Sequence, residues 1–209
     1  MRLSVSGLDF SDSVDDVINL LSHYEWVEKL FDKIENVGPL EGSLDTYVKG
    51  NFIDVDRLLS DNFLKDADER MLILTSRKLT SEVCTKYLKG IADTGTGVCV
   101  SSFESYETEK NSNESPELLN LLYGKMKNGL TAGKDPATDR RFYDSVLKLE
   151  FLSCVTTSYH ELLHTFGLDH CKIKSCVMYQ DENLHSYTTQ KLCKTHEKKM
   201  EKNLRNFVA

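Results

Sequence analysis

Three histidines and a glutamate near position 160 have the residue types and spacing of a hydrolytic zinc centre. His160 and His164 are four residues apart, so on a helix they lie on one face and can present two imidazoles to a single ion. Gly167 follows one turn later, where glycine can adopt the left-handed conformation that ends a helix, and the chain can then return to bring His170 to the ion. Three imidazoles leave a fourth position for water, as in catalytic zinc sites.

Glu161 is the expected general base of this centre. It follows His160 directly, about 100° around a helix, so it misses the metal but can hydrogen-bond a water in the open position. The alternative interpretation is a helix that keeps these residues but no longer holds a metal.

A second set of metal ligands begins directly after His170. Cys171 and Cys176 form a C-x4-C pair, and Cys193 and His196 form a C-x2-H pair. Thiolate and imidazole ligands in two such pairs fit a closed, tetrahedral, structural zinc site. The segment beyond Gly167 is short enough to need such a metal to hold it. The sequence therefore predicts two zinc ions, one catalytic and one structural.

Met178 lies two residues after Cys176, between the two ligand pairs. Its thioether could form an apolar floor beneath the histidine-bound ion, because methionine packs well against aromatic rings. An ordinary buried methionine fits this position equally well.

The composition favours an acidic enzyme. The 209 residues carry a net charge of −7, and 40% are hydrophobic, which fits a single catalytic domain. Within it we expect an N-terminal subdomain of residues 1–166 and a small zinc-bound subdomain of residues 167–209. The charge argues against nucleic-acid binding, which needs clustered Lys and Arg. The sequence shows neither a signal peptide nor a membrane span. We therefore expect an intracellular, cytoplasmic monomer with no membrane partner and with reduced cysteines.

Hydrophobic periodicity predicts a mixed set of strands and helices. The strands expected are 2–10, 46–55, 70–75 and 98–103, and the helices are 11–36, 80–89 and 191–205. A helical pattern also runs from Pro136 to Phe166, and its length predicts a break or two helices.

The pattern H-E-x-x-H-x-x-G-x-x-H with a following methionine is the metzincin signature. With a cysteine directly after the third histidine, residues 149–204 resemble the archaemetzincins, a metzincin group with a second zinc beside the catalytic one. The resemblance implies a Met-turn at Met178. One position departs from the family, because His196 stands where the family has its last cysteine. The ligands implied by the resemblance are His160, His164 and His170 for the catalytic zinc, and Cys171, Cys176 and Cys193 for the second.

The resemblance also implies a fold and an activity. The fold is of the α/β class: a twisted mixed sheet with flanking helices, an active-site helix and a small zinc-bound C-terminal lobe. The activity is hydrolysis of a peptide or protein substrate by a zinc-bound water, with Glu161 as base. In metzincins the substrate lies along an edge strand, which we assign to Val98, Cys99, Val100 and Ser101.

Three other functions remain open at this point. The first is a catalytically weak or inactive zinc protein that binds peptides or partners, which the intact Glu161 disfavours. The second is a zinc hydrolase that acts on something other than peptides. The third, a zinc-ribbon nucleic-acid binder, is disfavoured by the negative charge.

Overall fold

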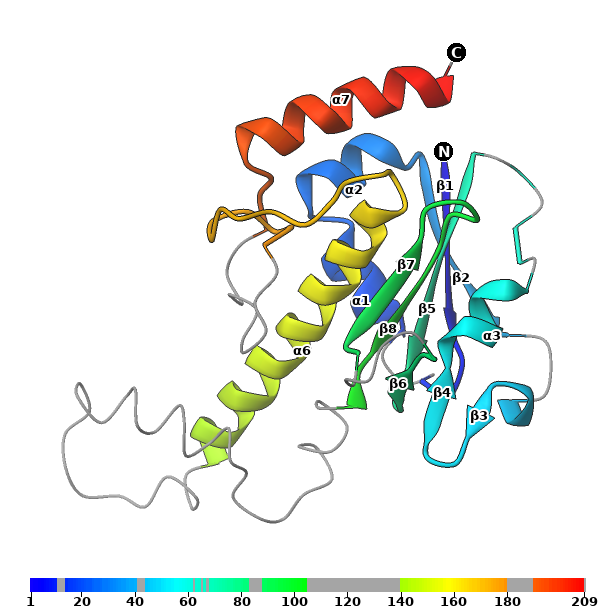
Figure 1. Ribbon diagram of the computed structural model, residues 1–209. Coiled ribbons are helices and arrows are strands. Elements are labelled where there is room, and N and C mark those ends of the chain that lie inside the picture. Colours follow the sequence, from blue (N-terminus) through cyan, green and yellow to red (C-terminus); the bar gives the residue numbers. More distant parts are fainter. Residues whose placement is uncertain are drawn as a thin grey trace.

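A mixed five-stranded sheet lies at the centre of the protein and separates two hydrophobic cores (Figure 1). The structure is a computed structural model that describes residues 1–10, 14–40, 44–61, 63–64, 66, 68–82, 88–104, 140–179 and 190–208. The strand order confirms the predicted α/β class with a mixed sheet and flanking helices.

The sheet is parallel except at one edge. Its strands, in spatial order, are β2 (Lys33–Pro39), β1 (Arg2–Gly7), β5 (Glu69–Thr75), β8 (Val98–Ser102) and β7 (Gly90–Asp93). The first four are parallel to their neighbours, whereas β7 runs antiparallel to β8. Every residue of β5 and β8 is buried, as expected for strands that are covered on both faces.

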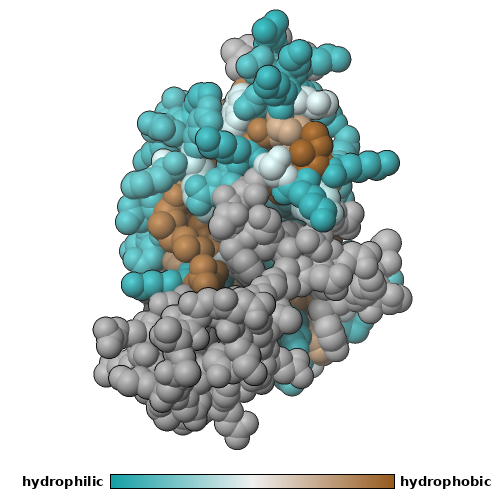
Figure 2. All heavy atoms as spheres, turned by 90° about the vertical axis from the view of Figure 1, so that its left-hand side faces the viewer, coloured by the Kyte–Doolittle hydropathy of each residue, from teal (hydrophilic) through white to brown (hydrophobic). Residues whose placement is uncertain are grey.

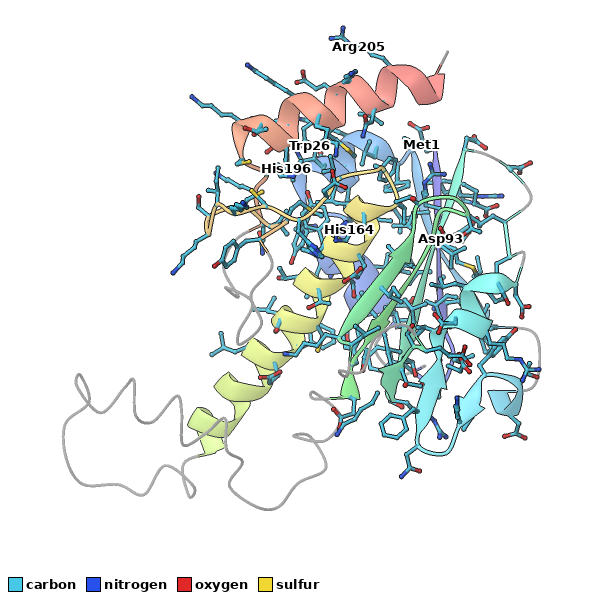
Figure 3. The ribbon with its side chains drawn as sticks, viewed as in Figure 1. Met1, Trp26, Asp93, His164, His196 and Arg205 are labelled. Atoms are coloured by element: carbon cyan, nitrogen blue, oxygen red, sulfur yellow. The ribbon has the colours of Figure 1, made fainter. Side chains whose placement is uncertain are left out.

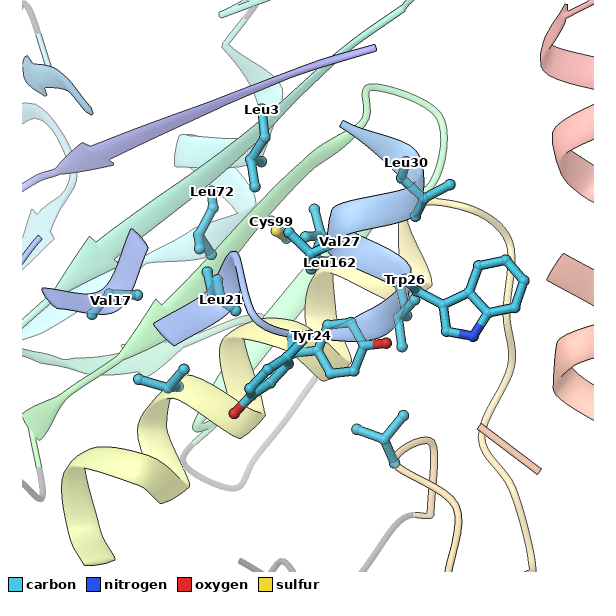
Figure 4. Packing of buried hydrophobic residues seen from close by; sticks show 14 of the residues in the cluster. Leu3, Val17, Leu21, Tyr24, Trp26, Val27, Leu30, Leu72, Cys99 and Leu162 are labelled. Carbon is cyan, nitrogen blue, oxygen red and sulfur yellow. The ribbon is translucent and has the colours of Figure 1, made fainter. Parts of the chain in front are cut away.

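In the part of the chain that the structure describes, three helices cover the face of the sheet on which the candidate metal ligands lie. They are α1 (Val14–Leu21), α2 (Glu25–Leu30) and α6 (Arg140–His164). Leu72 and Cys99 of the sheet belong to the same core as Leu162 of α6, and Figure 4 shows them facing these helices. Tyr24 packs edge-on against Tyr159 of α6, with ring centroids 4.7 Å apart.

A smaller layer covers the opposite face. It contains the 3-10 helix η1 (Leu44–Thr46), the strands β3 (Val48–Lys49), β4 (Phe52–Asp54) and β6 (Lys78–Thr80), and the helix α3 (Val55–Ser60). Met71 and Ile73 of β5 pack into this layer, whereas Leu72 and Leu74 face the helices. This alternation is the period of two of a strand that is buried on both faces.

Helix α6 carries the candidate catalytic residues on its last turns. It is continuous from Arg140 to His164, so the predicted break is wrong within this range. Its first turns extend past the sheet (Figure 1), and Leu149 is 38% exposed. The face of the molecule drawn in Figure 2 is mainly hydrophilic over its described residues, with two smaller hydrophobic areas. Within the described residues, no helix has the length and hydrophobicity that crossing a membrane requires.

Helix α7 (Lys194–Val208) lies across one end of the helical layer, close to the segment that follows α6 (Figure 1). Its Met200 is fully buried in the core that α6 shares with the sheet. This helix agrees with the prediction for 191–205.

The single helix predicted for 11–36 is wrong. In the described residues the chain turns at Ser22, whose hydroxyl donates to the carbonyl of Asn19, and α2 then ends at Leu30. Residues 33–39 pair with β1 as a parallel edge strand. The strand predicted for 46–55 divides into β3 and β4 around Gly50, which has a φ of 68°.

The remaining strand predictions agree with the structure. The strands at 2–10, 70–75 and 98–103 are confirmed as β1, β5 and β8. The helix predicted for 80–89 lies largely outside the described residues.

Candidate metal centres

The end of α6 brings two of the predicted ligands face to face. The Nε2 atoms of His160 and His164 are 3.0 Å apart, and Figure 3 shows His164 on the last turn of the helix. Gly167 ends the helical path in the left-handed region, with a φ of 76°, as predicted. The chain then turns back, and one ligand nitrogen of His170 lies within 4.8 Å of those of the other two histidines.

Hydrogen bonds fix the tautomers of the two helical histidines. Nδ1 of His160 is 2.7 Å from the carbonyl oxygen of Val177, and Nδ1 of His164 is 2.6 Å from that of Leu168. A carbonyl oxygen can only accept, so both Nδ1 atoms carry the proton and donate it. In neutral imidazoles the two Nε2 atoms then face each other with lone pairs only. A shared cation relieves this repulsion, and histidine ligands in metal sites are oriented in the same way.

The distances between the ligand atoms and the neutral state of the imidazole rings also fit zinc. For Zn–N bonds of roughly 2.0–2.1 Å, two ligand nitrogens of a tetrahedral site lie about 3.3 Å apart, close to the 3.0 Å between His160 and His164. Burial lowers the pKa of His164 and of His170, which keeps both rings neutral and able to ligate.

Glu161 follows His160 on α6, on the side of the helix that faces the edge of the sheet. Its side chain is only 8% exposed, and burial raises its pKa to about 8. It lies directly against the backbone of Gly90, the first residue of β7: a Cβ atom at position 90 would be 2.5 Å from Cγ and 2.8 Å from Oε1 of Glu161. The absence of a side chain at Gly90 therefore allows the carboxyl group to occupy its place.

The second predicted ligand set also assembles. One ligand atom each of Cys171, Cys176, Cys193 and His196 lies within 4.8 Å of the others. The Sγ atoms of Cys171 and Cys193 are 3.8 Å apart, close to the spacing of about 3.8 Å that Zn–S bonds of roughly 2.3 Å give in a tetrahedron. Nδ1 of His196 is 3.3 Å from Sγ of Cys193 and 3.8 Å from Sγ of Cys176.

The surroundings of this set fix the imidazole of His196 and favour a thiolate at Cys193, whereas burial raises the pKa of the Cys176 thiol. Nε2 of His196 is 3.0 Å from the carbonyl oxygen of Asp169 and therefore donates to it, which leaves the lone pair of Nδ1 directed at the sulfurs. The backbone N–H of Cys193 donates to Sγ of Cys176 at 3.3 Å. Although burial opposes it, hydrogen bonds with His196 and the neighbouring cysteines lower the pKa of the Cys193 thiol to about 6.

Met178 lies in a tight turn between the two ligand pairs. The backbone N–H of Tyr179 donates to the carbonyl of Cys176 at 2.9 Å, and Met178 is fully buried in the main core. The preceding carbonyl, that of Val177, accepts the hydrogen bond from His160. The segment with Met178 therefore lies against the histidine centre, while its role as an apolar floor stays a prediction.

The edge strand assigned to a substrate is wrong. Val98, Cys99, Val100 and Ser101 belong to β8, which pairs with β5 on one side and with β7 on the other. The backbone groups of β8 are therefore engaged inside the sheet. The edge strand on this side of the sheet is β7 (Gly90–Asp93), and its first residue, Gly90, lies against Glu161.

Sequence reasoning missed two contributors to this region. The first is Gly90, for which the only signal was an isolated glycine before a short apolar stretch. The second is Asn203 of α7, whose side-chain amide donates to the carbonyl of Phe166 at 2.8 Å, at the end of α6. Its i+7 spacing from His196 places both on one helix face and could have indicated it.

Solved structures resemble this protein, although its sequence has no match. No protein-family model matches the sequence, and no curated protein matches it. The structure is similar to an archaemetzincin from Methanopyrus kandleri, with a TM-score of 0.64 and 20% identity over 98% of this chain and 96% of that chain. It is also similar to an archaemetzincin from Archaeoglobus fulgidus, with a TM-score of 0.53 and 16% identity over 95% of this chain and 99% of that chain.

A third solved structure agrees with these two. It is a zinc-dependent peptidase from Methanocorpusculum labreanum, with a TM-score of 0.53 and 17% identity over 95% of this chain and 99% of that chain. These likenesses extend over almost the entire length of every chain compared. The fold of this protein is therefore similar to that of the archaemetzincins.

Proposed function

We propose that the protein is a zinc-dependent metallopeptidase with one catalytic and one structural zinc ion. One observation carries the proposal: His160 and His164 present two Nε2 lone pairs to each other at 3.0 Å, and Glu161, the residue after His160 on the same helix, is buried. A metal centre beside a proton acceptor is the arrangement needed to hydrolyse an unactivated bond. The fold shared with a zinc-dependent peptidase supports the choice of a peptide substrate.

The zinc ion, when bound by His160, His164 and His170, supplies an open coordination position and a Lewis acid that activates water and polarises a carbonyl group. The residues of the chain orient the ligands and transfer the proton. The carbonyls of Val177 and Leu168 hold the rings of His160 and His164 in the ligating orientation. Glu161 accepts the proton of the attacking water and passes it to the leaving amine.

The position of Glu161 also indicates where the substrate binds. The outer edge of β7 is not paired with another strand among the described residues, and β7 begins at the residue that contacts Glu161. An extended peptide can add to such an edge through main-chain hydrogen bonds. We therefore propose that the scissile peptide lies along β7 rather than along β8.

A binding protein that holds both zinc ions without hydrolysis is the second candidate. It needs the same ligands but no proton acceptor. Glu161 is buried against Gly90, and burying a carboxyl group costs free energy that a protein with no need of a proton acceptor could avoid. This observation favours the peptidase.

The first test is the zinc content of the purified protein. We expect about two zinc ions per chain, and about one in His164→Ala prepared in the same way, because three-ligand sites that lose a ligand bind zinc much more weakly. Elemental analysis measures this directly, and circular dichroism checks that the fold is retained. A wild type with two zinc ions should then cleave members of a peptide library.

Cys176→Ser provides the matched variant for the other centre. It should also reduce the zinc content to about one ion, and it should lower the melting temperature, because a closed structural site contributes to folding. One zinc ion in the wild type and an unchanged content in His164→Ala would contradict the histidine centre. Two ions with no cleavage of any peptide would favour the binding protein.

A further inference from the structure

The two candidate centres are joined by a short piece of backbone. His170 and Cys171 are neighbours in the sequence but belong to different ligand sets. The two residues before them, Leu168 and Asp169, offer consecutive carbonyl groups. The carbonyl of Leu168 accepts from Nδ1 of His164, and that of Asp169 accepts from Nε2 of His196. In each centre, one histidine ligand therefore holds this backbone through the ring nitrogen that does not face the metal position.

Helix α7 contributes three hydrogen bonds to the same segment. His196, Lys199 and Asn203 are spaced i, i+3 and i+7, so they lie on one face of the helix. His196 binds the carbonyl of Asp169, Lys199 pairs with the Asp169 side chain, and Asn203 donates to the carbonyl of Phe166 at 2.8 Å. These contacts fix residues 166–169, which connect the second histidine ligand to the third.

His170 depends on this support more than the other two ligands do. His160 and His164 are part of a long helix packed in the core, whereas His170 is exposed and follows the helix end. Its position is set by the path of residues 166–169 before it and by Cys171 after it. The backbone N–H of Cys171 donates to the carbonyl of Met178 at 2.7 Å.

We propose that the two centres bind zinc cooperatively, so that an occupied cysteine centre raises the zinc affinity of the histidine centre. A metal bound to His196 and Cys171 orders residues 166–171 and thereby holds His170 in its ligating position. Asn203 acts as a positioning residue for the same segment. The inference rests on the two zinc centres of the proposed function but not on peptidase activity. By linkage, an occupied histidine centre also raises the affinity of the cysteine centre by the same factor.

The test is the zinc affinity of the histidine centre, measured by competition with a chromogenic chelator. We expect a loss of about 10-fold or more in Cys176→Ser, because removing groups that orient a metal ligand typically costs 10- to 100-fold in affinity. Cobalt substitution identifies which centre is filled, since thiolate-to-cobalt charge-transfer absorption arises only at the cysteine centre. Equal affinities in the wild type and in a folded Cys176→Ser would overturn the proposal.

Asn203→Ala tests the positioning of the same segment without removing a ligand. All seven ligands remain, so the cobalt spectrum of the cysteine centre should be unchanged while the histidine centre binds zinc several-fold more weakly. Lys202→Ala is the matched control, because Lys202 is the adjacent residue of α7 and is exposed. An affinity loss as large in Lys202→Ala as in Asn203→Ala, or none in either, would overturn the positioning role of Asn203. Peptide cleavage is not needed for any of these readings, so an inactive protein with coupled centres would disprove only the peptidase.

Discussion

Glu161→Gln is expected to lower kcat/KM for peptide cleavage by roughly 100- to 10,000-fold, the range attributed to general acid–base catalysis. Glutamine has the size and shape of glutamate but cannot accept the proton of the attacking water. Glu161 is not among the residues whose atoms converge on either metal position. The zinc content should therefore stay at the wild-type value while turnover falls, and parallel elemental analysis and peptide assays measure both.

Glu150→Gln is the matched control for this prediction. Glu150 is also buried on α6, but it lies almost three turns before the histidines. Its replacement should leave kcat/KM close to the wild-type value. Undiminished turnover in Glu161→Gln would exclude Glu161 as the base, and a loss of zinc in that variant would show that it supports the metal instead.

Gly90→Ala is expected to lower kcat by about 100-fold, since a displacement of about 1 Å in a catalytic group can have an effect of this size. A Cβ atom at position 90 would be 2.5 Å from Cγ of Glu161 and 2.9 Å from its Cδ, so the carboxyl group has to move. Gly90 does not have a positive φ, and the alanine itself causes no backbone strain. Steady-state kinetics and zinc analysis of the variant check the prediction.

Gly95→Ala is the corresponding control in the same hairpin. A Cβ atom there would be 3.4 Å from the nearest atom, Oδ1 of Asp93, which is ordinary contact. We expect wild-type kinetics for this variant. If Gly90→Ala raised KM and left kcat unchanged, the added methyl group would be blocking the peptide rather than displacing Glu161.

The candidate metal ligands could be predicted from the sequence because their spacing is local. His160 and His164 are one helical turn apart, and each Cys or His pair lies within a few residues. Such short separations are determined by helix geometry and by tight turns, which depend little on the rest of the fold. The structure brings all seven of these residues into two groups.

The edge of the sheet could not be predicted in this way. The apolar residues from Val98 to Ser102 indicate a buried strand, but strand order depends on pairings between distant segments. All four residues of the short β7 are half-buried, a uniform pattern that hydrophobic periodicity does not reveal. In the same way, the apolar stripe of 11–36 predicted one long helix. The change to a strand at 33–39 depends on pairing with β1, which lies far away in the sequence.

The hydrogen bonds from α7 to residues 166–169 have a consequence for biosynthesis. The helix that carries His160 and His164 leaves the ribosome before His196 and Asn203 do, by a few seconds at synthesis rates of about 5–20 residues per second. During this interval the segment that leads to the third histidine lacks the hydrogen bonds from α7 to Phe166 and Asp169. The nascent chain of the proposed peptidase should therefore lack an ordered third ligand for its histidine centre until α7 has been made and has docked.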